Sequence, residues 1–138
     1  MYRKILVAYD GSESSKKAFD AALDIAAGDG AELYVLSVVR TLEVADEVET
    51  EAVIENSRQY HSKLLAPLQH LVSSRGIKGH FEVTVGHPAE QILYDSDRHD
   101  VDLIVVGHRG RSKFTRLLLG SISKHVVQYA NRAVLVVR

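Results

Sequence analysis

The sequence predicts a doubly wound α/β fold, with a five-stranded parallel sheet and helices on both faces. Segments rich in β-branched and aliphatic residues recur along the chain, and four of them are nearly continuous in hydrophobicity: Lys4–Tyr9, Glu32–Val39, Asp102–Gly107 and Ala133–Val137. Such runs are typical of strands that are covered on both faces, as in parallel sheets. Helical patterns fill the gaps, and this alternation favours parallel strands joined by right-handed crossovers.

The remaining strand and the first helix follow from shorter signals. His80–Val85 alternates apolar and polar residues, which indicates a strand with one wetter face near an edge of the sheet. Ser12 or Ser14 can cap a helix after the first strand, and Gly28 and Gly30 can end that helix.

The later helices are predicted by their first residues. Pro88 suits the first turn of a helix, and the last helix is expected to begin at Ser121. The apolar face of that last helix would consist of Ile122, Val126, Val127 and Ala130.

The segment from Thr41 to Ser74 has the weakest pattern. Its first part, residues 42–55, is acidic and contains Glu43, Asp46, Glu47, Glu49, Glu51 and Glu55. This acidic stretch is most simply a solvated face. We expect a mobile loop there, followed by a long helix that is kinked near Pro67.

The composition fits one globular domain over residues 1–138, because 46% of the residues are hydrophobic and 25% are charged. The formal net charge of -1 provides no overall field for nucleic acid or an anionic membrane, so neither is expected as a partner. The chain has no cysteine, which excludes disulfides and thiolate metal sites. No apolar run has the length of a membrane helix or a signal peptide, so we expect a cytoplasmic protein.

A glycine-rich basic loop follows the predicted strand Asp102–Gly107, the fourth in chain order. Gly107 and Gly110 leave main-chain amides uncovered by side chains, and Gly120 then opens the last helix. A helix start presents unpaired N–H groups, to which Ser121 and Ser123 can add hydroxyl donors. Local positive charge comes from Arg109, Arg111, Lys113 and Arg116. These features favour an anion site, and the alternative is a flexible basic loop in which the glycines only permit the turn.

Common nucleotide and metal motifs are missing from the sequence. There is no G-x-x-x-x-G-K-[ST] sequence, and no G-x-G-x-x-G follows the first strand. The 7 histidines form no H-E-x-x-H motif and no i, i+4 pair, so no dedicated metal site is expected. A nucleotide-binding loop in this chain must therefore have a different sequence pattern.

The spacing Gly107-x2-Gly110-x9-Gly120-Ser121 resembles the ATP-binding signature of the universal stress protein family. Stretches similar to the family's pattern occur in the same order along nearly the whole chain: KILVAYDGSESSKKAFDAALDIA, GHPAEQIL, DLIVVGHRG, LLLGSISKHVVQYA and AVLVVR. The resemblance weakens only from about Thr41 to Gly79.

The resemblance implies an ATP-binding domain with strand order 3-2-1-4-5 that dimerises through its last strand, Ala133–Val137. It implies that Asp10 lies near the ribose or helps to hold Mg²⁺, and that the main chain of Val38 meets adenine. The glycine loop would line the ribose and the phosphates, and His108 stands where Ser or Thr is more usual in the family. The nucleotide-binding positions carried over are Ala8, Asp10, Val38, Gly107, His108, Arg109, Gly110, Gly120, Ser121, Ile122 and Ser123.

The expected function is therefore a nucleotide-responsive, dimeric regulatory module of the stress response, with no catalytic residues. The last strand, Ala133–Val137, is apolar and has no charged residue or proline to prevent edge pairing, which also favours pairing with a second copy. The alternatives are a slow Mg²⁺-dependent ATP hydrolase and a dimeric structural module with an unoccupied cleft. Asp10 could also simply cap the first helix together with Ser12. Related hydrolases and adenylating enzymes carry S-G-G-x-D-S or H-I-G-H, and a phosphorelay receiver needs a second adjacent acid after the first strand. The chain has none of these features.

Overall fold

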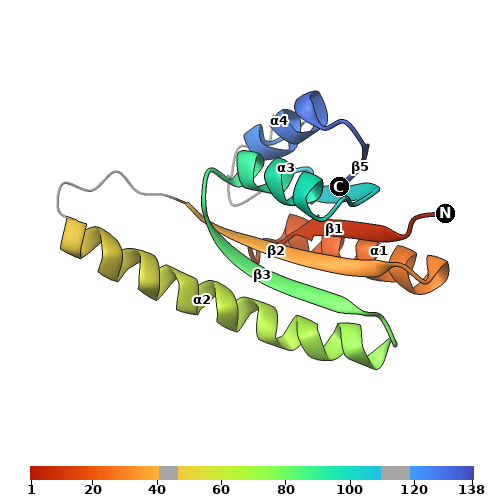
Figure 1. Cartoon of the computed structure of the whole chain (residues 1–138), viewed down its shortest axis with the longest axis horizontal. Helices are drawn as coiled ribbons and strands as arrows, with labels where there is room; N and C mark the ends of the chain where they lie inside the picture. The colour runs from red at the N-terminus through yellow and green to blue at the C-terminus, as the bar shows by residue number, and fades with distance from the viewer. Residues whose placement is uncertain (41–46, 110–118) are drawn as a thin grey trace.

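The structure, a computed structural model, describes residues 1–40, 47–109 and 119–138 (Figure 1). Strands and helices alternate along the chain: β1 (Lys4–Ala8), α1 (Glu13–Asp29), β2 (Glu32–Arg40), α2 (Glu47–Ser74), β3 (Gly79–Gly86), α3 (Pro88–Arg98), β4 (Leu103–Gly107), α4 (Ser121–Tyr129) and β5 (Ala133–Val137). This alternation confirms the predicted α/β class.

The strands form one 5-stranded parallel sheet in the order β3-β2-β1-β4-β5. The order is the one that the family resemblance implies, and β3 lies at an edge as its alternating pattern predicts. From β1 the chain builds outward to β2 and β3, then crosses to the other side of β1 to form β4 and β5. The strand order thus reverses between β1 and β4. Ligands of such sheets bind at this point, beyond the carboxyl ends of the strands.

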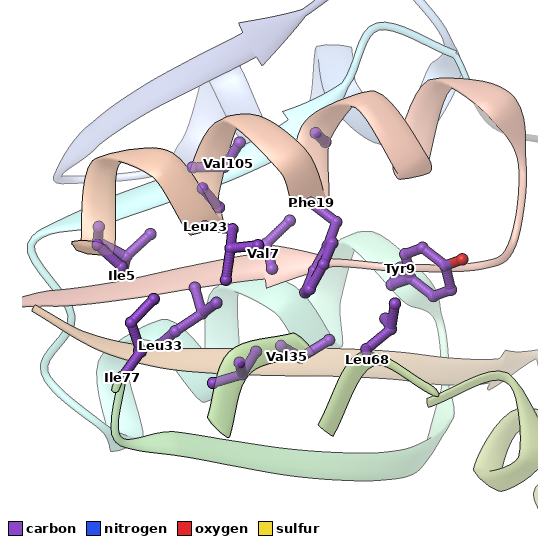
Figure 2. Close-up of a cluster of buried hydrophobic side chains, with 14 of the residues drawn as sticks. Ile5, Val7, Tyr9, Phe19, Leu23, Leu33, Val35, Leu68, Ile77 and Val105 are labelled. Carbon is purple, nitrogen blue, oxygen red and sulfur yellow. The ribbon is translucent and has the colours of Figure 1, made fainter. Parts of the chain in front are cut away.

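Helices α1 and α2 cover one face of the sheet. Phe19 of α1 and Leu68 of α2 are buried there in one cluster with Val7 and Val35 of the strands (Figure 2). The Tyr9 ring meets the Phe19 ring edge to face, with centroids 6.1 Å apart. Full burial of an aliphatic or aromatic side chain of this kind contributes about 1.5 to 3 kcal/mol, so this layer anchors the end of β1 at which Tyr9 lies.

Helices α3 and α4 cover the opposite face. Leu6, Ile92, Ile104 and Val126 are at most 1% exposed in that layer. The predicted apolar face of the last helix is wrong at Val127, whose side chain is 46% exposed. Successive helix residues point about 100° apart, so the register that directs Val126 to the sheet leaves its neighbour in solvent.

The ends of α1 follow the predicted cap residues. Ser12 is the N-cap, since its side-chain oxygen accepts a hydrogen bond from the Ser15 N–H at 3.1 Å. Ser14 lies inside the helix. Gly30 is the C-cap in the left-handed conformation, with a φ of 69°, whereas Gly28 is still helical.

Helix α2 begins earlier than the sequence pattern suggests. Several acidic residues expected in a loop lie instead in its first turns: Glu47, Glu49, Glu51 and Glu55. Residues 41–46 of the expected mobile loop lie outside the described residues, and Pro67 lies within the helix. Neither α2 nor any other helix of the described residues has both the length and the apolar character needed to cross a membrane.

Candidate functional site

A cavity of about 370 Å³ lies at the carboxyl ends of β1, β2 and β4, where the strand order reverses. The starts of α3 and α4 and one side of α2 complete its wall. Its lining residues are Ala8, Tyr9, Asp10, Ser15, Leu36, Val38, Val39, Arg40, Ser57, His61, Pro88, Ile92, Val106, Gly107, Arg109, Gly120, Ser121, Ile122 and Ser123. The volume is of the size that small-molecule ligands occupy in proteins.

The structure brings most of the predicted site residues together in this cavity. All of them line it except His108 and Gly110, and Gly110 lies outside the described residues. The predicted basic residues Arg111, Lys113 and Arg116 also lie outside the described residues.

Asp10 takes part both in a turn and in the cavity wall. Its Oδ1 atom accepts a hydrogen bond from the Ser12 N–H at 2.9 Å, and its own N–H donates to the Ser15 hydroxyl at 3.3 Å. This local turn leads from β1 into α1. Ser12 is the N-cap residue, and Asp10 supports the same helix start while it also lines the cavity, so its structural role and a role in the site are compatible.

Gly107 is required by packing. A Cβ atom at this position would lie 2.4 Å from the Ser14 hydroxyl oxygen and 2.8 Å from the Ser14 carbonyl carbon and oxygen. The end of β4 therefore approaches the first turn of α1 more closely than any other residue type allows. This contact fixes the start of the glycine loop against α1.

Gly120 is brought back to the end of β4 by hydrogen bonds to His108. The Gly120 N–H donates to the His108 carbonyl oxygen at 2.6 Å, and the Ser123 hydroxyl lies 3.0 Å from the same oxygen. Gly120 has φ −68° and ψ 164°, a conformation open to every residue type. Backbone conformation therefore does not require a glycine here.

The serines at the start of α4 differ in their surroundings. Ser123 is 2% exposed, and its hydroxyl lies at hydrogen-bond distance from main-chain carbonyl oxygens of His108 and Gly120. Ser121 is exposed as the first residue of the helix. The main-chain N–H groups of this first turn are thus the donors that the cavity presents to an anion, with the Ser121 hydroxyl beside them.

His108 and Ser14 do not form a nucleophile and its base. The Arg109 Nε atom can only donate, and it lies 3.1 Å from His108 Nε2, so Nε2 accepts and the neutral ring carries its proton on Nδ1. That nitrogen is 3.4 Å from the Ser14 hydroxyl oxygen, which also accepts from the Arg109 main-chain N–H at 3.2 Å. A ring protonated on Nδ1 cannot take the Ser14 proton. The three residues instead tie the start of the glycine loop to α1.

Sequence reasoning missed the wall that α2 contributes. Ser57 and His61 line the cavity one helical turn apart, and no sequence motif marks them. The one available signal is Ser37, a polar residue inside the apolar run of β2, which is fully buried and hydrogen-bonded to His61.

Tyr9 is a further lining residue that the sequence analysis missed. Burial raises the pKa of its phenol above the ordinary value, and the hydroxyl, which is protonated at neutral pH in any case, can donate a hydrogen bond.

Comparison with known proteins agrees with this geometry. The sequence profile of the universal stress protein family matches residues 1–138. Universal stress protein YxiE of Bacillus subtilis is 35% identical over 153 residues, which cover 100% of both chains. The solved structure of universal stress protein UspA from Lactobacillus plantarum superposes with a TM-score of 0.92 at 27% identity, covering 99% of this chain and 98% of that one. A universal stress protein in complex with cAMP matches with a TM-score of 0.77 at 26% identity, covering 99% and 97%. The chain belongs to the universal stress protein family.

Proposed function

We propose that the chain binds ATP as its magnesium complex and acts as a dimeric, nucleotide-responsive regulatory module of the stress response. The observation that carries the proposal is the cavity at the strand-order reversal, which joins an apolar wall to the open first turn of α4. A related structure holds the adenine nucleotide cAMP, which supports this ligand class. The chain's lack of cysteine suits a reducing compartment such as the cytoplasm.

The two ends of the cavity suit the two ends of a nucleotide. Leu36, Val38 and Ile92 offer apolar surface for a base on the side of β2. At the other end, the first turn of α4 after Gly120 presents N–H groups and a partial positive charge to phosphates. Arg109 adds a positive side chain to the same wall.

The described residues fit a metal held mainly by the nucleotide. No group of three His, Asp or Glu side chains among them could hold a metal ion. Asp10 is the carboxylate in the described cavity wall. Mg²⁺ is often bound through one or two carboxylates together with substrate phosphates, so Asp10 would supply the protein's share. In this proposal the cavity binds ATP, and hydrolysis of ATP is secondary.

Gly120→Val is expected to weaken ATP binding by tenfold or more, because its branched side chain would occupy the space over the first turn of α4. The conformation of Gly120 accommodates valine, so the fold should survive the change. Calorimetric titration of ATP into both proteins measures the effect, and Gly120→Ala should give an intermediate loss. Equal affinity of all three proteins would show that the phosphates do not lie at Gly120.

We also propose that β5 pairs with a second copy of the chain. Within the described sheet β5 hydrogen-bonds to β4 along one edge, and its other edge is the end of the sheet. Leu135 of β5 is 36% exposed, and Tyr129 at the end of α4 is 62% exposed. An apolar strand with open N–H and C=O groups readily pairs with another strand.

Leu135→Lys is expected to convert the dimer to a monomer, because two lysines would face each other across an interface that excludes water. Light scattering after size exclusion should give 15.3 kDa for this variant and twice that mass for the parent protein. Val53→Lys is the matched control, since Val53 on α2 is 37% exposed and lies far along the chain from β5. A monomeric parent protein at micromolar concentration would contradict the proposed dimer.

A further inference from the structure

Helix α2 is packed firmly along only part of its length. Its carboxyl-terminal part is held in the core by Leu65, Leu68 and Val72, which are at most 7% exposed. From residue 51 to residue 64, no side chain of the helix is buried. The first turns also extend beyond the carboxyl ends of the strands (Figure 1). We call residues 51–63 the arm of α2. Because few buried contacts hold the arm, it needs less free energy to move than the packed part does.

A proline marks the end of the arm. Leu64 is the first of the described α2 side chains that packs against the core, and Pro67 follows it within one helical turn. Pro67 has no N–H to donate to the carbonyl oxygen of Lys63, four residues before it, and its ring crowds that carbonyl group. One hydrogen bond of the helix is therefore missing where the arm joins the packed part. Pro67 is exposed, so burial does not offset the cost of a proline inside a helix.

The arm forms one wall of the cavity through polar side chains. Ser57 and His61 lie one turn apart on its inner side, and both line the cavity. The packed part of α2 presents leucine and valine side chains to the sheet instead. Polar side chains are readily solvated when they leave a protein surface. The arm can therefore move away from the cavity without exposing a large apolar surface to water.

A buried hydroxyl group of the sheet connects β2 to the arm. Ser37 is 0% exposed, and its side-chain oxygen forms a hydrogen bond with His61 Nδ1 at 2.5 Å. Leu33 and Val35, at neighbouring positions of the same strand, are buried and apolar, so Ser37 is a polar exception in β2. A single hydrogen bond contributes modestly to stability. It therefore favours the position in which the arm lies against β2, but it can break.

We propose that the arm is a lid on the cavity, which bends at Pro67 and is held closed by the Ser37–His61 hydrogen bond. The inference rests on the proposed binding of ATP, and it adds the part of the chain that controls entry and release. In the closed position Ser57 and His61 complete the wall around the nucleotide. Lid opening sets the rate at which many proteins release their ligands. Ser37 is then a positioning residue, because it acts on the ligand through the arm.

Distances between two spin labels test whether the arm moves. The chain has no cysteine, so labels attach only to cysteines that are introduced. One label pair joins the arm to α1 through Val53→Cys and Lys17→Cys, and the matched pair replaces Val53→Cys by Leu71→Cys on the packed part. Val53 and Leu71 are 37% and 45% exposed, so both accept a label. Pulsed electron paramagnetic resonance should give a broader distance distribution for the Val53 pair than for the Leu71 pair. Mg·ATP should narrow the distribution of the Val53 pair.

Two substitutions test the parts of the lid separately. Ser37→Ala removes the hydrogen bond, so it should broaden the distribution of the Val53 pair and leave that of the Leu71 pair unchanged. It should also raise the dissociation rate of a fluorescent ATP analogue about three- to tenfold in stopped-flow measurements. Pro67→Ala restores the missing N–H, so it should narrow the distribution of the Val53 pair without nucleotide.

The outcomes separate the lid from the proposed function. Equal distributions for the two label pairs without nucleotide, or no effect of Ser37→Ala on the Val53 pair, would overturn the lid. If Ser37→Ala broadens both distributions because the strand itself is disturbed, His61→Phe removes the same hydrogen bond from the arm and decides the question in its place. Failure of the parent protein to bind ATP would overturn the proposed function, whereas the distances without nucleotide would still test the lid.

Discussion

Gly107→Ala is expected to lower the free energy of unfolding by about 1 to 3 kcal/mol, because the added methyl group has no room between β4 and α1. Its Cβ atom would lie 2.4 Å from the Ser14 hydroxyl oxygen and 2.8 Å from the Ser14 carbonyl group. The hydroxyl can rotate away, but the carbonyl belongs to the backbone of α1 and cannot. Either α1 or the end of β4 must move.

The same change should also weaken nucleotide binding. The Ser14 hydroxyl accepts the Arg109 main-chain N–H at 3.2 Å, so separating β4 from α1 displaces the residue that leads into the glycine loop. Urea unfolding measures the loss of stability, and ATP titration measures the loss of affinity.

Gly28→Ala is the matched control for this prediction. Gly28 lies inside α1, and a Cβ atom there would meet nothing within 4 Å. Alanine is the better helix former, so this variant should gain about 0.5 to 1 kcal/mol. If both glycine variants shifted the unfolding curve in the same direction, the packing explanation for Gly107 would be wrong.

Asp95→Asn is expected to stabilise the protein at neutral and alkaline pH by about 1 to 3 kcal/mol, the usual cost of a buried polar group without a hydrogen bond. Asp95 on α3 is 1% exposed, and neither of its carboxylate oxygens has a hydrogen-bond partner among the described residues; Oδ1 lies 3.3 Å from Arg98 Nη2, as an ion pair. Burial raises the pKa of Asp95, and the nearby Glu82 carboxylate on β3 raises it further, while Arg98 and His99 oppose the shift. An asparagine amide can donate to Glu82 without carrying a charge.

The direction of the pH dependence follows from this raised pKa. Below 3.8, the ordinary value, Asp95 is protonated in both the folded and the unfolded chain. As the pH rises above that value, the unfolded chain loses the proton first, so the folded state loses stability until Asp95 itself ionises. The advantage of Asp95→Asn should therefore vanish near pH 3.8 and grow as the pH increases.

Urea unfolding of both proteins across this pH range measures the difference. Glu82→Gln should be less stable overall, since Glu82 bonds to Arg98 and His99, but it should flatten the pH dependence that comes from Asp95. A constant difference in stability between the parent protein and Asp95→Asn at every pH would show that Asp95 has the same pKa in the folded and the unfolded chain.

The elements with strong local signals were predictable from the sequence. The apolar runs of β1, β2, β4 and β5 and the cap residues Ser12, Gly30 and Pro88 depend on near neighbours in the chain. The start of α2 was not predictable in this way, because a cluster of glutamates is compatible with both a solvated loop and the first turns of a helix. Val127 was misplaced because packing against the sheet, and not the apolar pattern alone, determines the rotation of α4.

The residue pattern by itself determined the fold class, the order of the strands through its family resemblance, and the glycine loop at the end of β4. Each of these features depends on a contiguous segment of the chain, because hydrophobic periodicity and cap residues act over a few positions. Only the tertiary structure decided which side chains complete the cavity and how they are oriented. Ser37 and His61 are 24 positions apart in the chain, and Gly107 and Ser14 are further apart still. Their meeting depends on how α1 and α2 cross the sheet, which no local pattern encodes.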